Sequence, residues 1–188
     1  TANSNQMLME FMGLQLPGGS FVNPGTPLRE ALTAEAVRRV LRLRASGGQY
    51  APIGRIVDEK AIVNAIVGLL ATGGSTNHTL HLVAMARAVG LTLTWDDMAA
   101  LSAVTPLLAR IYPNGSADVN HFQAAGGFAF LARQLLAAGL LHGDARTVWD
   151  APLGGCLQLP ALDDGRLAWR DPPANSGDPS VLRGIDAP

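Results

Sequence analysis

The sequence of 188 residues is poor in cysteine and in charge, and both shortages limit what the protein can be. Its one cysteine, Cys156, excludes an internal disulfide, fits a reducing cytoplasm, and cannot alone hold an iron–sulfur cluster, which takes three or four thiolates. Charged residues make up 15% of the chain and the net charge is −1. There is therefore no basic field for nucleic acid and no polybasic patch for a membrane surface, whereas small-molecule partners remain open.

Long hydrophobic runs are also missing. The longest is interrupted by Asn64 and by a Gly-Ser-Thr-Asn turn, so no stretch reaches the roughly 20 apolar residues that cross a bilayer. The chain contains no secretory signal, phosphate-binding P-loop, dinucleotide fingerprint or Gly-x-Ser-x-Gly elbow. Membrane, nucleotide-dependent and serine-hydrolase functions therefore lack support.

What the sequence does contain is a pair of helices between Asp58 and Gly90 that organises the rest. Apolar residues surround most of the stretch from Ala61 to Thr72, so we expect a largely buried helix that ends at Gly73 and Gly74. We expect Ser75 or Thr76 to cap the second helix. Its apolar stripe is predicted to be Leu80, Val83, Ala84 and Ala88.

The turn between these helices is the first candidate site. A helix N-terminus offers unpaired N–H groups and a positive dipole end, so Ser75, Thr76, Asn77 and His78 are predicted to contact a carboxylate or a phosphate. An ordinary helix cap is the more common explanation for such a turn.

A second polar group, Asn120 with His121, precedes Gly126-Gly127 and would suit a polyhydroxylated ligand, although ordinary capping explains it too. His78 and His81 share a helix face but lack the further ligands of a zinc site, so we predict no metal site in this chain.

Helix outweighs strand elsewhere. A helix is expected from Leu28 to Ala45, with Arg38, Arg39, Arg42 and Arg44 on a solvated face; a partner carboxylate or a phosphate is the alternative for these arginines. Short strands are expected at 107–111 and 146–149. The chain begins without methionine and closes in a Pro-, Gly- and Asp-rich segment, so we expect an excised piece: a helix-rich domain at 1–150 and a loop-rich tail or linker at 151–188.

Four segments together resemble one enzyme family, the dihydroxy-acid/phosphogluconate dehydratases. They are TANSNQMLMEFMGLQLPG from Thr1, KAIVNAIVGLLATGGSTNHTLHLVAMARAVG from Lys60, IYPNG from Ile111, and VNHFQAAGGFAFLARQLLAAGLLHGD from Val119. The resemblance covers about residues 1–148. Within the family, GGSTNHTLHL and NHFQAAGG look like the branch that acts on phosphogluconate rather than the branch that acts on branched dihydroxy acids.

The resemblance implies a helix-dominated α/β fold, part of a three-layer α/β/α N-terminal domain that is incomplete as cut. It implies a cytoplasmic, homo-oligomeric hydro-lyase of the Entner–Doudoroff route, which dehydrates a sugar-acid phosphate with an iron–sulfur cluster and a divalent cation. In such enzymes the cluster cysteines and the base lie outside this piece, so no cofactor is expected in the piece itself and no catalytic residue is assigned. Thr1 and Asn3 would lie beside the cluster. A catalytically silent helical binding module is the alternative from another class.

Overall fold

A computed structural model describes residues 2–188, so the role expected for Thr1 lies outside the described residues. In chain order the helices are α1 (Ala2–Phe11), α2 (Pro27–Leu43), α3 (Ile53–Ile56), α4 (Glu59–Thr72), α5 (Asn77–Ala88), α6 (Trp95–Val104), α7 (Val119–Ala124) and α8 (Gly127–Ala137). A short 3₁₀ turn (Leu153–Gly155) and the strands β1 (Leu159–Asp163) and β2 (Arg166–Arg170) follow. The expected helix-dominated α/β composition is confirmed.

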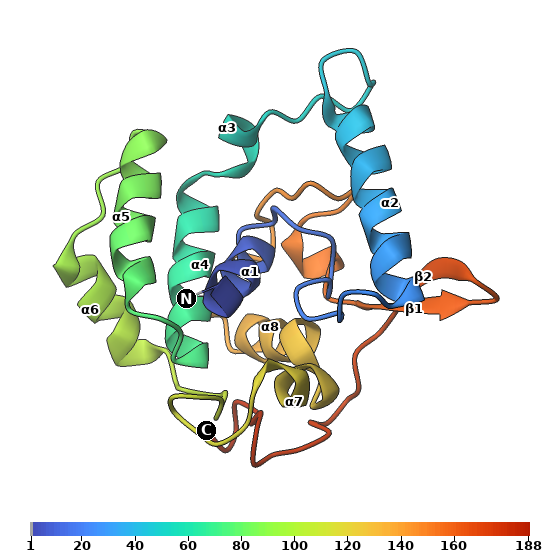
Figure 1. Ribbon diagram of the computed structural model, residues 1–188. Helices are drawn as coiled ribbons and strands as arrows, with labels where there is room; N and C mark the ends of the chain where they lie inside the picture. Colours follow the sequence, from blue (N-terminus) through green and yellow to red (C-terminus); the bar gives the residue numbers. More distant parts are fainter. Residues whose placement is uncertain (1) are drawn as a thin grey trace.

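Helix α4 lies between α5 and α1 (Figure 1). Most of its residues are buried, so the prediction of a largely buried helix is confirmed. The helix contacts α1, α5 and α6. Gly68 lets α1 come close, because a Cβ atom there would lie 2.3 Å from the Phe11 ring. Phe11 then meets Phe128 of α8 edge-to-face, with ring centroids 4.9 Å apart. Two hydrophobic clusters result, one toward α7 and α8 and one toward α5 and α6.

The inward face of α5 differs from the predicted stripe. His78, Leu82 and Ala86 are the buried residues, whereas Leu80 is 65% exposed. The contact of α5 with α4, rather than the spacing of its apolar residues alone, decides which face turns inward. None of the described helices is both long and apolar enough to span a membrane.

Both predicted strands are wrong. Residues 107–111 form only isolated bridges, at Ala109 and Ile111, and residues 146–149 are irregular. Backbone groups of these segments bond to other parts of the chain instead. Leu108 N–H donates to Ala71 O of α4 at 2.8 Å, and Arg110 N–H donates to Val181 O at 2.7 Å.

The only sheet among the described residues is the antiparallel hairpin of β1 and β2, which the sequence analysis missed. It contacts α2 at the edge of the molecule (Figure 1). Asp164 and Gly165 at its tip have φ values of 48° and 75°, and an Asp-Gly pair in this conformation is a strong hairpin signal. Val181 and Leu182 beyond the hairpin are buried in the core, and the boundary at residue 150 stays a prediction.

Candidate functional site

All four family-like segments contribute to one cleft of about 480 Å³, and Asp118, the residue just before the fourth segment, lines it too. Asn3 and Ser4 come from the start of α1, and Ser75 and Thr76 come from the turn between α4 and α5. The remaining lining residues are Met7, Thr72, Gly73, Gly74, Ile111, Tyr112, Pro113, Asp118 and Val119. The structure thus brings distant parts of the sequence to a single opening.

Gly73 shapes this cleft as predicted. It is left-handed, with φ 56° and ψ 40°, and its N–H closes the last carbonyls of α4. A Cβ atom at Gly73 would lie 2.0 Å from Asn114 Nδ2, which donates to Gly73 O at 2.8 Å. The glycine therefore ends the helix and also admits the turn that follows Tyr112.

The N–H groups at the start of α5 point mainly at protein atoms. Ser75 N–H donates to Ser4 Oγ at 2.9 Å, and His78 N–H donates to Ser75 O at 3.0 Å. Of the two caps predicted for α5, Thr76 makes no side-chain cap bond, because it is itself helical (φ −58°, ψ −20°). The Ser75 side chain does accept from the helix start, since Asn77 N–H donates to Ser75 Oγ at 3.4 Å. A ligand here would therefore meet side chains more than helix-end amides.

Only some of the predicted site residues line the cleft. Asn3, Ser75 and Thr76 line the cleft, whereas Asn77 is exposed and lies outside its lining residues. His78 is 1% exposed, its Nδ1 has no hydrogen-bond partner among the described residues, and burial lowers its pKa, which favours the neutral ring.

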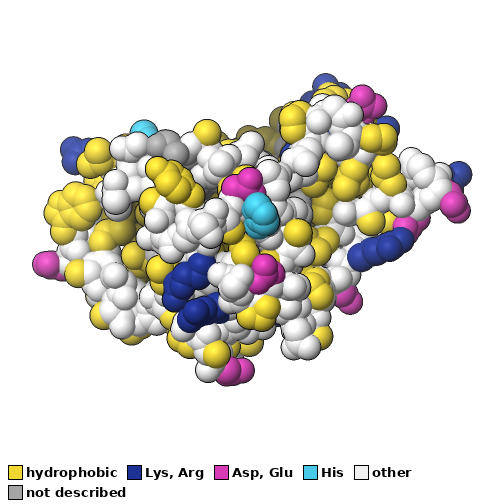
Figure 2. Space-filling model, turned by 60° about the horizontal axis from the view of Figure 1, so that its bottom comes forward, with side chains coloured by type: hydrophobic (Ala, Val, Ile, Leu, Met, Phe, Trp, Pro, Cys, Tyr) yellow, Lys and Arg dark blue, Asp and Glu magenta, His cyan; other side chains and the backbone are white. Residues whose placement is uncertain are grey.

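Asp118 is a cleft residue that the sequence analysis missed. It caps α7 by accepting from the N–H groups of Asn120 and His121 at 2.8 and 3.1 Å, and its carboxylate lies 2.9 Å from His121 Nδ1. These bonds lower the pKa of Asp118, so it is ionised at neutral pH. Asn120 and His121 are therefore capping residues beside the cleft. Figure 2 shows histidine and acidic side chains side by side near the middle of this face of the molecule.

The signal that could have identified Asp118 is its spacing. An aspartate three residues before a side chain that can reach back to it forms a reciprocal cap at a helix start. The same kind of reciprocal cap joins Thr94 and Asp97 at the start of α6.

The polar side chains of the lining are mostly neutral, and they are set among apolar residues such as Met7 and Ile111. The lining includes the hydroxyl groups of Ser4, Ser75, Thr76 and Tyr112, and one carboxylate, while no lysine or arginine is among the lining residues that the structure describes. Hydroxyls and a carboxylate are suitable partners for the hydroxyl groups of a sugar acid. A phosphate would find no positive side chain here.

The described residues do not fit as ligands of a metal or cluster. Between residues 2 and 188 no group of three or more His, Cys, Asp and Glu side chains comes together. Cys156 is buried, its Sγ donates to Ala151 O at 3.3 Å, and burial raises the pKa of its thiol. A protonated, enclosed thiol is a poor metal ligand.

Fold and site therefore define a helix-rich domain with a cleft that carries several hydroxyl groups and one carboxylate. Residues 1–155 match the family described as "Dihydroxy-acid/6-phosphogluconate dehydratase N-terminal", and the chain belongs to this family.

The similarity to curated relatives extends along the whole chain. Phosphogluconate dehydratase of Pseudomonas aeruginosa is 62% identical over 188 residues, and that of Escherichia coli K12 is 57% identical. The chloroplastic dihydroxy-acid dehydratase of Arabidopsis thaliana is 35% identical over 192 residues. In each case the match covers 100% of this chain and 31% of the relative, so the chain spans about a third of the length of these relatives.

Proposed function

We propose that the full-length protein containing this chain is a hydro-lyase that dehydrates 6-phosphogluconate to 2-keto-3-deoxy-6-phosphogluconate. The observation that carries this proposal is the difference in identity, 62% to a phosphogluconate dehydratase against 35% to a dihydroxy-acid dehydratase over the same residues. A cytoplasmic homo-oligomer and a domain boundary near residue 150 belong to the same proposal.

In this proposal, the cleft lined by Ser75, Thr76 and Asp118 holds the polyhydroxylated part of the substrate. The side chains of Ser75 and Thr76 lie on one wall, and the Asp118 carboxylate accepts a hydrogen bond from a sugar hydroxyl on the other. The iron–sulfur cluster and divalent cation of the family would supply Lewis-acid chemistry at the leaving hydroxyl. Because the described residues do not fit as ligands of either group, we assign no step of the reaction to them.

The test is an assay of the purified full-length protein for keto-acid release from 6-phosphogluconate and from a branched 2,3-dihydroxy acid. Preference for 6-phosphogluconate supports the proposal. Preference for the dihydroxy acid would assign the sister activity, and turnover of neither by cluster-loaded protein would favour a silent binding module.

The cleft is tested separately by Asp118→Asn in the full-length protein. The amide keeps an oxygen for the helix cap but loses the charge that strengthens a hydrogen bond to a sugar hydroxyl, so we expect kcat/KM to fall roughly tenfold. Asp97→Asn is the matched control, because Asp97 completes the same kind of cap on α6 outside the cleft. Equal effects of the two substitutions would contradict the assignment.

A further inference from the structure

A second cleft, of about 570 Å³, lies away from the candidate site and has a different chemistry. One wall is the segment around α3, with Tyr50 and Arg55, and the other is the segment from Arg146 to Pro152. The two clefts share no lining residue.

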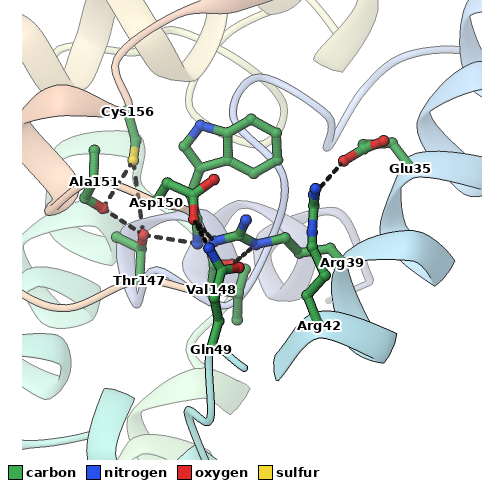
Figure 3. A network of polar contacts seen from close by, with 10 residues as sticks. Glu35, Arg39, Arg42, Gln49, Thr147, Val148, Asp150, Ala151 and Cys156 are labelled. Carbon is green, nitrogen blue, oxygen red and sulfur yellow. Dashed lines mark hydrogen bonds and ion pairs between the residues drawn. The ribbon is translucent and has the colours of Figure 1, made fainter. Parts of the chain in front are cut away.

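A buried polar network fixes the second wall (Figure 3). Arg39 is 3% exposed, contrary to the solvated face expected for it, and its Nε donates to Val148 O at 2.5 Å. Trp149 N–H donates to Thr147 Oγ1 at 3.0 Å, and that hydroxyl donates to Ala151 O at 2.7 Å. The segment is therefore held in shape before any ligand arrives.

The same network neutralises the one carboxylate in this cleft. Arg39 Nη2 donates to Asp150 Oδ1 at 2.7 Å, and this contact lowers the pKa of Asp150. The Arg39 guanidinium also lies over the Trp149 ring, 5.1 Å from its centroid. Asp150 is thus a paired charge and leaves the rest of the lining positive.

Two arginines supply that positive charge. Arg146 Nη1 donates to the backbone oxygen of Arg55 at 3.5 Å, and the Arg55 guanidinium lies over the Tyr50 ring, 5.6 Å from its centroid. Both arginines line the cleft. Among the described residues, neither forms an ion pair with a carboxylate, so both charges are available to an anion.

We propose that this cleft binds a phosphate group through Arg55 and Arg146. The guanidinium groups match phosphate oxygens in charge and in hydrogen-bond geometry, and the fixed wall keeps the entropic cost of binding low. The two clefts lie at opposite ends of α4, because Arg55 precedes the helix and Gly73 ends it. The 14 residues of this helix span about 21 Å, which is farther than a phosphorylated six-carbon acid reaches. The phosphate therefore belongs to a ligand separate from the sugar acid of the first cleft. The proposal rests on the second cleft alone and does not depend on the proposed activity.

The test is calorimetric titration of the full-length protein with inorganic phosphate at low ionic strength. We expect Arg55→Gln and Arg146→Gln each to weaken binding about tenfold, because each removes one charged hydrogen-bonding partner. Arg87→Gln is the matched control, since it removes the same charge from an exposed position near the end of α5, outside this cleft. Unchanged binding in both cleft variants would overturn the proposal, and so would the absence of phosphate binding by the unsubstituted protein.

Kinetics with the same variants test whether this ligand is separate from the substrate. We expect both substitutions to leave KM for 6-phosphogluconate unchanged while phosphate binding is lost. A rise of about tenfold in KM for 6-phosphogluconate in both variants would overturn the assignment to a separate ligand. Failure of the activity assay alone would leave the calorimetric result standing.

Discussion

Glu10, at the end of α1, is a buried carboxyl group that faces two backbone donors. Gly18 N–H and Ser20 N–H donate to its two oxygens at 3.0 and 2.6 Å. These bonds connect α1 to the loop that follows it. Burial raises the pKa of Glu10 from 4.5 to about 7, and the hydrogen bonds only partly oppose that rise. The position that ties α1 to the loop therefore titrates near neutral pH.

This pKa predicts how stability depends on pH. Between about pH 4.5 and 7 the unfolded chain loses the Glu10 proton while the folded chain keeps it, so the free energy of unfolding falls as pH rises. The full fall is about 3 kcal/mol. Urea unfolding at pH 4.5 and 7.5 measures it. Glu10→Gln should lose this component, whereas the control Glu30→Gln, at an exposed glutamate of α2, should retain it. An unchanged pH dependence in Glu10→Gln would refute the assignment.

At the scale of elements, the α1–α4 contact depends on the missing side chain at Gly68. Gly68→Ala would push a methyl group into the Phe11 ring, which α8 holds from the other side through Phe128. We expect a loss of about 1–3 kcal/mol in unfolding free energy, despite the higher helix propensity of alanine.

The control is Gly54→Ala in α3, where no atom lies within 4 Å of the added methyl group. It should be neutral or slightly stabilising. Denaturant titration of both variants distinguishes a packing effect from a backbone effect, and equal changes would argue against the packing explanation.

Features that depend on contacts between neighbouring residues could be predicted from the sequence, whereas features that depend on distant contacts could not. The α4–α5 pair and the left-handed Gly73 were predictable, because local periodicity and glycine placement specify them. The buried Arg39 was not, because its partners Val148 and Asp150 are more than a hundred residues away in sequence. The same holds for the cleft. Its individual segments could be recognised in the sequence, but tertiary packing brings them together beside Asp118, and the sequence pattern does not predict this.

At the scale of the whole molecule, α4 contributes to both hydrophobic clusters. Val67 and Ala71 belong to the cluster with α8, whereas Ile62 and Ile66 belong to the one with α5 and α6. A helix shared in this way couples the two halves, because neither cluster can be lost without exposing part of α4. We therefore expect the described part of the chain to unfold in one cooperative step.

A local probe and a global probe of unfolding can test this. In Trp95→Phe, the remaining fluorescence comes from Trp149 and Trp169, whose ring centroids lie 4.7 Å apart at the hairpin, while circular dichroism follows all helices. The two transitions should coincide. Leu82→Ala and Leu131→Ala, one in each cluster and both fully buried, should each cost about 2–5 kcal/mol and shift both signals equally. If Leu82→Ala moved only the dichroism, α5 and α6 would form a separate folding unit, and the coupling through α4 would be disproved.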